Sequence, residues 1–352
     1  MRLCYFGTYE RAYPRNAQVI SCLRSVGVDV HEEHVAVWDD LREGWRAGPG
    51  RALRLAAAEA RLFRRRPRGF DALIVGYPGH FDLPAARRAA RGRPVVFNPL
   101  VSLADTLVGD RGRFRPGSPA ARVLERIDRH AFRSADLVVA DTDAHARFLA
   151  QLASRDDIAV CFVGAEERMF RPAWEPRTPF TVFFVGKLIP LQGVETIVAA
   201  SRAAPELPFR IVGSGQLAPL LADLPPNVQH VPWVEYERLP AELRSAGCAL
   251  GIFGTTAKAQ RVIPNKAFQA LACGTPLVTA DTPAARELLT DGESALLVPP
   301  GAPAALAEAL RRLATDEALA RRIAAGGRAA YDRAASEAVL GARWRELIEA
   351  LL

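Results

Sequence analysis

Short apolar segments, each about the length of one strand, alternate with helix-like segments along almost the whole chain. A continuous apolar run of this length is typical of a strand that is buried on both faces of a parallel sheet. The alternation therefore predicts an α/β fold with doubly wound sheets. The predicted strands are residues 2–7, 28–35, 71–77, 94–99, 135–142, 158–165, 181–186, 209–215, 228–234, 248–254, 275–281 and 295–300.

The intervening segments predict helices. Asn16 is a suitable N-cap for a helix over 17–27, and Gly27 is suited to end it. Residues 331–352 form an amphipathic stretch that no strand follows, and we expect it to pack back toward the N-terminal part of the chain. The other predicted helices are residues 51–66, 84–91, 118–135, 143–152, 194–204, 217–224, 239–247, 264–274 and 306–316.

The chain of 352 residues is too long for one ordinary core, which predicts two domains. A linker over 171–179, RPAWEPRTP, contains three prolines, and the strand–helix pattern restarts after it. We therefore predict Rossmann-like domains over 1–172 and 173–330, with 331–352 as a C-terminal helix. Two such domains in tandem place a cleft between them, lined by loops at the carboxyl ends of both sheets.

Composition indicates a globular protein of the cytoplasm. The chain is 49% hydrophobic and 24% charged, and no apolar stretch approaches the ~20 residues of a membrane span. The N-terminal sequence MRLCYFGTYE lacks the long apolar segment and cleavage site of a signal peptide. Five cysteines without a CxxC pair are expected to be buried thiols: Cys4, Cys22, Cys161, Cys248 and Cys273.

The net charge of +7 is confined to the first half of the chain. Residues 1–172 contain 28 arginines and 21 acidic residues, whereas residues 173–352 contain 18 basic and 18 acidic residues. This asymmetry predicts an anionic partner, such as a membrane surface, with a solvated arginine-rich surface as the alternative. Nucleic acid fits less well, because few aromatic residues interrupt the basic tracts. The tracts are 61–68, 85–93 and 110–115.

The chain has 46 lysine and arginine residues but only three lysines, Lys187, Lys258 and Lys266. The segment KAQRVIPNK, 258–266, joins a predicted strand to a predicted helix that starts near Pro264. Free N–H groups and the helix dipole make such a helix start an anion site, and lysine is a compact charge for phosphate. We therefore predict a phosphate site here, within reach of Arg261; an exposed helix start without a ligand is the alternative.

A second segment, FVGKLIPLQG, 184–193, also joins a predicted strand to a predicted helix. A predicted strand ends at Gly186, Lys187 follows, and a helix starts after Gly193. The glycines allow close approach of the backbone, and we expect Lys187 to reach the same cleft.

Two other motifs have competing interpretations. GSGQLA, 213–218, matches a dinucleotide fingerprint with Glu235 about 20 residues further on, which makes a nicotinamide-dependent oxidoreductase an alternative function. However, the motif follows the second predicted strand of its domain instead of the first. DTD, 141–143, spells a metal-binding motif of some sugar transferases, but helix capping is the favoured interpretation.

Four ordered segments between 173 and 325 resemble retaining glycosyltransferases of family four, which have the GT-B architecture. These segments are FVGKLIPLQGVETIVAA, RIVGSGQL, the donor segment PNKAFQALACGTPLVTADTPAARELL with Glu287, and ALLVPPGAPAALAEALRRLATD. The first half of the chain resembles the family only in layout. The P-N-K variant of the donor segment resembles that of bacterial enzymes for surface glycans.

The resemblance implies transfer of a hexose from a UDP- or GDP-sugar to a glycan, lipid-linked or small-molecule acceptor, with retention of configuration. It implies no metal and no cofactor, a donor site in 173–330 and an acceptor site in 1–172. A non-catalytic nucleotide-sugar-binding protein is the other alternative. The implied donor-binding residues are Gly7, Gly186, Lys187, Gly213, Trp233, Lys258, Arg261, Asn265, Lys266 and Gln269.

The sequence departs from the family at three positions. Arg261 and Gln269 stand where the family has two glutamates with seven residues between them, and Gln192 replaces a basic residue. A glutamine amide can still bind the ribose diol, and Lys258 or Arg261 can restore the missing charge.

The predicted catalytic residues are Asp105, Lys187 and Lys266, of which the resemblance implies the two lysines. We expect Asp105 and the loop 9–16 on the acceptor side, with loop capping as the alternative. The arginine-rich half predicts peripheral docking on the anionic inner face of the cell membrane.

Overall fold

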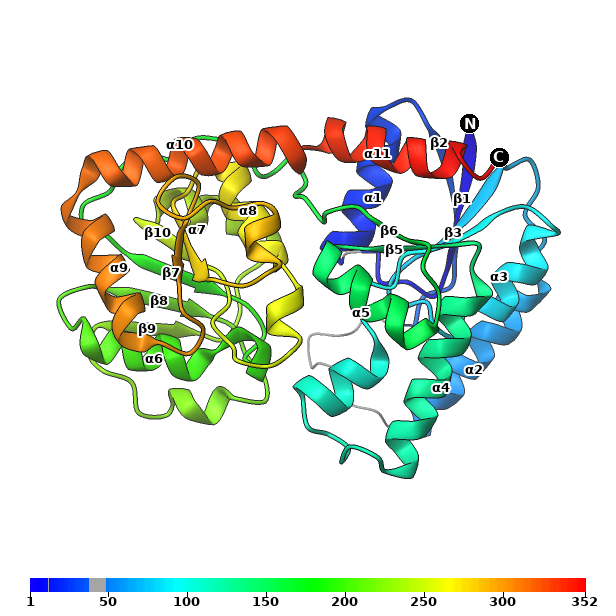
Figure 1. The fold of residues 1–352 in the computed structure, drawn as a ribbon, viewed down its shortest axis with the longest axis horizontal. Coiled ribbons are helices and arrows are strands. Elements are labelled where there is room, and N and C mark those ends of the chain that lie inside the picture. Colours follow the sequence, from blue (N-terminus) through cyan, green and yellow to red (C-terminus); the bar gives the residue numbers. More distant parts are fainter. Residues whose placement is uncertain (12, 38–48) are drawn as a thin grey trace. The chain divides into compact units, whose positions relative to one another are not determined.

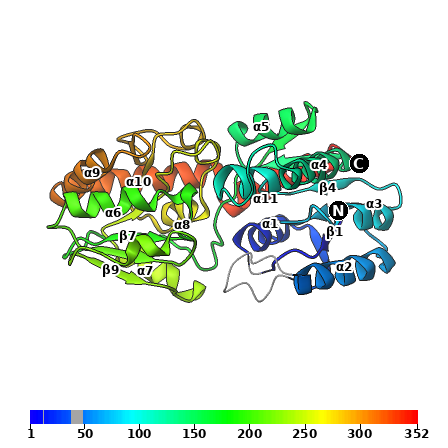
Figure 2. The ribbon, with the colours of Figure 1, turned by 90° about the horizontal axis from the view of Figure 1, so that it is seen from below.

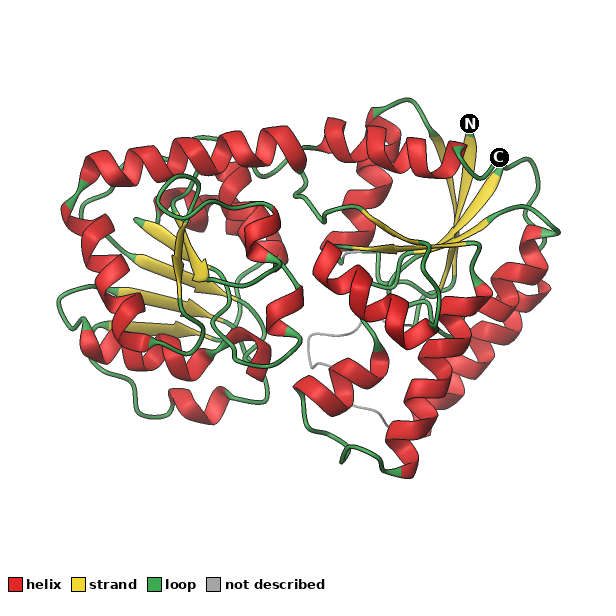
Figure 3. Cartoon of the chain, in the orientation of Figure 1, coloured by secondary structure: helices red, strands yellow, loops and turns green. Residues whose placement is uncertain are grey.

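The computed structural model describes residues 1–11, 13–37 and 49–352, and the chain divides into two compact units. Unit 1 comprises Met1–Val163 and Glu337–Leu352, and unit 2 comprises Gly164–Ser336. Each unit contains one parallel sheet of six strands with helices around it (Figure 3). The predicted α/β class with two Rossmann-like, doubly wound sheets is therefore confirmed.

The first unit ends before the predicted residue 172. Residues 164–171 belong to unit 2 because Glu166 accepts a hydrogen bond from the Tyr236 hydroxyl, at 3.2 Å, and Phe170 packs edge-on against the Tyr236 ring.

The sheet of unit 1 has the strand order β2-β1-β3-β4-β5-β6. All of its neighbouring strands run parallel, in register pairs such as Leu3 with Val30 and Leu3 with Ala72. Helical connections are required between parallel strands, and the structure has them between successive strands. The strands are β1 (Arg2–Gly7), β2 (Asp29–His34), β3 (Ala72–Val75), β4 (Val95–Phe97), β5 (Leu137–Ala140) and β6 (Ile158–Val160).

Helices bury both faces of this sheet, which explains the continuous apolar strands. Alternate residues of one strand serve opposite faces: Phe6 packs in one cluster with α2, α3, α4 and α5, and Tyr5 in another with α1 and α11 (Figures 1 and 2). The helices are α1 (Pro14–Ser25), α2 (Pro49–Arg64), α3 (Leu83–Ala90), α4 (Pro119–Ser134), α5 (Asp143–Ala153) and α11 (Glu337–Glu349).

The C-terminal helix α11 completes the core of unit 1. Trp344 is fully buried in the cluster that α1 forms with the sheet. A Cβ at Gly341 would lie 2.3 Å from the Cys22 carbonyl oxygen, so α11 approaches α1 as closely as only glycine permits. Residues 331–334 of the expected C-terminal helix belong instead to a preceding helix of unit 2, and the Ser336 hydroxyl donates to the Asp332 carbonyl just after that helix ends.

The sheet of unit 2 has the order β12-β11-β10-β7-β8-β9. Its first strand, β7, is therefore central, and the chain moves outward to one side and then to the other. The strands are β7 (Val182–Val185), β8 (Phe209–Val212), β9 (Val228–Val231), β10 (Cys248–Leu250), β11 (Leu277–Ala280) and β12 (Leu296–Val298).

Two helix predictions for unit 2 need correction. The predicted helix 217–224 is only a 3-10 turn, η4 (Ala218–Leu221), because Pro225 disfavours a helical backbone at Leu224. The long helix α10 (Glu317–Ala334) was not predicted as a unit. The remaining helices of unit 2 are α6 (Val194–Ala203), α7 (Leu239–Ser245), α8 (Asn265–Cys273) and α9 (Pro303–Thr315).

Capping differs from the sequence interpretation at one helix and agrees at another. Asn16 does not cap α1; Tyr13 precedes Pro14 there, and Asn16 Oδ1 accepts from the Tyr5 hydroxyl at 2.9 Å. In the DTD motif, the Thr142 hydroxyl accepts from the His145 N–H at 3.0 Å, so the capping interpretation is confirmed.

All five cysteines are buried free thiols. In the described part of the chain, no helix is both long and apolar enough to cross a membrane.

We predict that Trp344→Ala destabilises unit 1 by about 3–5 kcal/mol, because it leaves a cavity under α11. Urea unfolding followed by circular dichroism measures the change. Val339→Ala on the same helix, where the side chain is 38% exposed, should stay within about 0.5 kcal/mol. Equal effects of the two substitutions would contradict a structural role for α11.

Candidate functional site

The strand order of unit 2 creates a switch point between β7 and β10. From β7 the chain proceeds through β8 and β9 on one side, and from β10 through β11 and β12 on the other. The carboxyl ends of β7 and β10 therefore flank the position where doubly wound sheets bind ligands, which is the crevice of this site. Gly186 and Lys187 follow β7 here, and the loop to α8 follows β10.

Lys266 places its ammonium group at the end of β7. Its Nζ donates to Gln192 Oε1 at 2.5 Å and lies 3.6 Å from the centre of the Phe184 ring. A Cβ at Gly186 would be only 3.2 Å from this Nζ. The structure thus brings Lys266 to the residue that directly precedes Lys187, as the sequence interpretation requires.

Burial controls the charge of this group. Lys266 is 7% exposed, and desolvation lowers its pKa well below the usual lysine value. The Gln192 oxygen and the face of the Phe184 ring favour the ammonium form, but neither carries a full negative charge. An anion bound here would supply the missing counter-charge.

The start of α8 adds backbone donors to the same place. Pro264 is the N-cap residue, so it precedes the first turn instead of lying within it, and no side chain caps the helix. Asn265 and Lys266 are the first two residues of the helix. Their N–H groups have no partner within the helix, and they lie at its positive end.

The loop between β10 and α8 holds the other two predicted cations. Lys258 is 8% exposed and directly precedes the 3-10 turn η6 (Ala259–Arg261), which ends in Arg261. Both residues lie in the segment that leads into the start of α8.

Glycines hold the loops of the crevice against one another. A Cβ at Gly193 would lie 2.4 Å from the Phe253 carbonyl carbon, and a Cβ at Gly254 would lie 2.5 Å from the Leu191 oxygen. The predicted close approach at Gly193 is confirmed. It joins the loop after β7 to the loop after β10.

The GSG segment, 213–215, also packs closely, here against the end of β7. Gly213 has a φ of 149°, and a Cβ there would lie 1.9 Å from the Gly186 carbonyl oxygen. A dinucleotide fingerprint requires a helix start directly after its glycines, whereas only η4 follows here. The glycines are therefore explained by contact with the end of β7, and the geometry does not favour a nicotinamide site.

Gln269 and Trp233 lie on different parts of unit 2. Gln269 is 4% exposed on α8, and its Nε2 donates to the Tyr236 hydroxyl at 3.2 Å. Trp233 follows β9 and is 54% exposed. Tyr236 and Glu166 were missed in the sequence interpretation. Tyr236 lies three residues after the predicted donor-binding residue Trp233, but no sequence signal connects it with Glu166.

The remaining predicted residues belong to unit 1. A Cβ at Gly7 would lie 2.1 Å from Asp82 Oδ2, and this carboxylate accepts from the Thr8 N–H at 2.7 Å, so glycine here accommodates Asp82. Asp105 opens the π-helix η2 (Asp105–Asp110), and its N–H donates to the Ser102 hydroxyl at 3.0 Å.

The predicted acceptor loop 9–16 is tied into unit 1 at both ends. Tyr9 is buried and donates to Glu32 at 2.8 Å, and Asn16 accepts from the Tyr77 N–H at 2.9 Å. Both side chains are thus bonded inside unit 1, and the acceptor-side role of the loop stays a prediction. Residue 12 of the loop lies outside the described residues.

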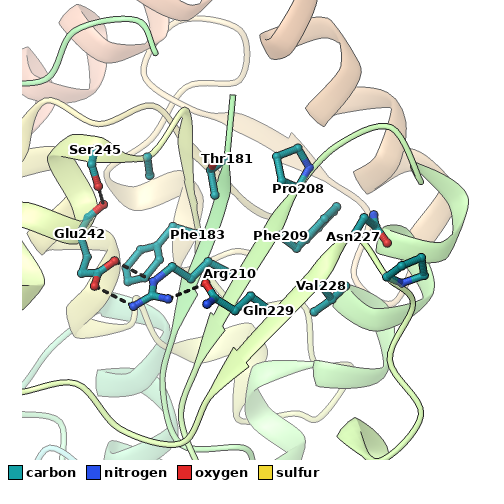
Figure 4. Close-up of a pocket in the computed structure, with 12 residues that line it drawn as sticks. Thr181, Phe183, Pro208, Phe209, Arg210, Asn227, Val228, Gln229, Glu242 and Ser245 are labelled. Carbon is teal, nitrogen blue, oxygen red and sulfur yellow. Dashed lines mark hydrogen bonds and ion pairs between the residues drawn. The ribbon is translucent and has the colours of Figure 1, made fainter. Parts of the chain in front are cut away.

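A pocket of about 560 Å³ lies at the opposite edge of the same sheet, at the amino ends of β7, β8 and β9 (Figure 4). Arg210 donates to both carboxylate oxygens of Glu242, at 2.8 and 2.9 Å, and to Gln229 at 2.7 Å (Figure 4). The charges in this pocket are paired with each other. The pocket is distinct from the crevice, because it lies at the amino ends of the strands and no predicted site residue lines it. Within the described residues, no three His, Cys, Asp or Glu side chains group as metal ligands.

Comparisons of sequence point to glycosyltransferases. Residues 192–349 match a family model described as glycosyl transferase-like. A D-inositol 3-phosphate glycosyltransferase of a Nocardioides strain is 29% identical over 337 residues, covering 85% of this chain and 71% of the relative. A phosphatidyl-myo-inositol mannosyltransferase of Mycobacterium leprae is 34% identical over 168 residues, covering 45% of this chain and 43% of the relative.

Comparisons of structure agree as well. Sucrose-phosphate synthase from Thermosynechococcus elongatus has a TM-score of 0.76 at 16% identity, covering 99% of this chain and 98% of that one. Anabaena HepE, solved with UDP and glucose, has a TM-score of 0.70 at 15% identity and is covered completely, as is this chain. The structural likeness shows the GT-B fold, and the sequence matches together support glycosyltransferase activity rather than nicotinamide chemistry.

Proposed function

We propose that this chain transfers a hexosyl group from a nucleoside-diphosphate sugar to a hydroxyl acceptor, with retention of anomeric configuration. The observation that carries the proposal is the buried Lys266 ammonium at the end of β7, beside the uncapped start of α8. A ligand with two adjacent phosphates fits this arrangement, because it can contact the helix start and a cation together. Anabaena HepE, which has the same fold, was solved with UDP and glucose, which supports a UDP-sugar as donor.

The proposed chemistry needs no protein nucleophile. The bond from the anomeric carbon to the diphosphate breaks, and the acceptor oxygen bonds to that carbon on the same face. The acceptor proton passes to the departing diphosphate. Lys187 and Lys266 stabilise the negative charge that grows on the diphosphate, and the Asn265 N–H donates to it. Because these groups supply the counter-charge, we propose that no metal is needed.

The other predicted residues have supporting roles in this proposal. Lys258 and Arg261, in the loop before α8, add positive charge, and Trp233 contacts the base. On unit 1, Asp105 is proposed to contact the acceptor. The inositol-containing substrates named for two relatives suggest a polyol or a lipid-linked polyol as acceptor.

We predict that Lys187→Ala and Lys266→Ala each lower kcat/KM by about 100-fold or more, as measured by release of UDP or GDP from sugar donors. Removing one preorganised group that stabilises developing charge typically costs about 3–4 kcal/mol. Arg202→Ala on α6, an exposed cation paired with Asp223, is the control and should retain activity. Turnover of the lysine variants at the control rate would exclude the phosphate assignment.

We also predict that nucleoside diphosphate binding takes up a proton at Lys266. In the free protein burial lowers the pKa of Lys266, and an adjacent phosphate raises that pKa again. Between the free and bound pKa values, binding therefore adds a proton, and affinity falls as the pH rises. Calorimetric titrations with UDP and GDP in buffers of different ionisation enthalpy measure this uptake.

Two methionine variants provide the matched comparison for this titration. Lys266→Met should lose the uptake, whereas Lys187→Met should bind more weakly and keep it. The same proton uptake in wild type and Lys266→Met would show that another group titrates.

We further propose that unit 1 docks on an anionic membrane through α2 and α3. The two helices lie side by side (Figure 1), and Arg88 spans them by donating to the Phe63 carbonyl at 3.1 Å. Leu53 is 72% exposed and Phe63 46% exposed, so apolar side chains accompany the charge, as interfacial helices require. The exposed arginines of this surface are Arg54, Arg61, Arg64, Arg65, Arg87, Arg88 and Arg91.

In flotation assays at low salt, the chain should bind vesicles that contain phosphatidylglycerol and not vesicles of phosphatidylcholine alone. Arg61→Glu/Arg64→Glu should weaken binding roughly 30-fold or more, since each basic group contributes about 1 kcal/mol. The control Arg202→Glu/Arg322→Glu changes the net charge equally on unit 2. Equal loss in both variants, or no binding by wild type, would refute docking through α2 and α3.

A further inference from the structure

Three side chains from distant parts of unit 2 form a hydrogen-bonded chain beside the candidate phosphate site. Gln269 lies one turn after Lys266 on α8 and therefore on the same face of that helix. Its Nε2 donates to the Tyr236 hydroxyl at 3.2 Å, and this hydroxyl donates to Glu166 Oε1 at 3.2 Å. Arg168 donates to the other oxygen of Glu166 at 2.9 Å.

The chemistry of these groups fixes the direction of every hydrogen bond in the chain. An ionised carboxylate only accepts, so Glu166 must receive the single proton of the Tyr236 hydroxyl. The Tyr236 oxygen can then only accept from Gln269, which turns the NH₂ end of the amide toward Tyr236. As a result, the Gln269 carbonyl oxygen is directed away from Tyr236.

Burial holds the arrangement in place. Glu166 is 5% exposed and Gln269 is 4% exposed. Desolvation, with the nearby Glu166 charge, raises the pKa of Tyr236 well above its usual value, so the phenol keeps its proton. The Nε2 end of the Gln269 amide is bonded to Tyr236, so Oε1 is the end that is turned away from this bond.

We propose that Glu166 and Tyr236 are positioning residues that present Gln269 Oε1 as an acceptor to the ribose of the bound nucleoside diphosphate. The inference rests on the proposed function and deepens it, because it makes the site selective for ribonucleotides. The ribose 2′-hydroxyl donates to Oε1, and the 2′-deoxy sugar lacks the hydroxyl at that position. Tyr236→Phe frees the amide to rotate, and the selectivity is lost.

The proposal also explains why glutamine stands at position 269. A glutamate there would face Glu166 across one hydroxyl, which has a single proton for two carboxylates. Glu166 would keep its bond from Arg168, but two buried carboxylates on one hydroxyl would repel each other, which is costly. The acceptor for the ribose is therefore an amide oxygen whose orientation is set by a carboxylate further away.

The test compares dissociation constants of UDP with 2′-deoxy-UDP, and of GDP with 2′-deoxy-GDP, by calorimetry. Wild type should bind the ribonucleotide about ten-fold more tightly, the effect of leaving one buried acceptor unpaired. In Tyr236→Phe the ratio should fall below about three-fold. The phenylalanine keeps the edge-on packing against Phe170, where the ring centres are 5.8 Å apart.

A reciprocal exchange separates orientation from simple structural damage. Gln269→Glu alone should weaken ribonucleotide binding and lose the selectivity. Glu166→Gln/Gln269→Glu should restore both, because the new amide donates to the Tyr236 oxygen and the Tyr236 proton passes to residue 269. Failure of the double variant to recover selectivity would overturn the positioning role.

Tyr331→Phe is the matched control. The hydroxyl of Tyr331 shares its proton between Glu167 and the Ala165 carbonyl, at 3.2 and 3.3 Å. The substitution therefore removes a similar bond from the same segment without touching Gln269. This variant should keep the wild-type ratio. A wild type that binds none of the four nucleotides would refute the proposed function itself. A wild-type ratio that Tyr236→Phe preserves would refute only the present inference.

Discussion

The buried ammonium of Lys266 is the interaction on which the candidate site depends. Moving a lysine out of water costs several kcal/mol unless the charge is compensated. Here the Gln192 oxygen and the Phe184 ring compensate it only in part. The site therefore holds a cation that is more stable with an anion beside it than alone. Gly186 matters for the same reason, because any larger residue would crowd the ammonium at the end of β7.

Sheet topology explains why these groups meet. Lys187 follows β7 and Lys266 follows β10, and about 80 residues of sequence separate them. The two strands are neighbours in the sheet, and because they are parallel, their carboxyl ends lie at the same edge. The glycines at 193, 213 and 254 then allow the loops to pack backbone against backbone. Binding chemistry and loop packing thus use the same few positions.

The sequence was sufficient for the strands and for the helix start at Lys266, because both depend on local signals. Continuous apolar runs mark buried parallel strands, and Pro264 with Lys266 marks a helix start. Three features could not be predicted in this way. The helix expected at 217–224 fails because Pro225 restricts its last turn, and α10 has no strand at either end to delimit it. Tyr236 joins Glu166 to Gln269 only through the tertiary fold, so no spacing reveals that chain.

The discontinuous make-up of unit 1 has a consequence for biosynthesis. Its last helix, α11, is encoded after the whole of unit 2, yet Trp344 belongs to the same core cluster as Val19, Cys22 and Leu23 of α1. During translation, that apolar face of α1 stays uncovered while the ribosome synthesises Gly164–Ser336. Unit 1 is thus started first and completed last, and the nascent chain exposes an apolar, aggregation-prone surface until α11 leaves the exit tunnel.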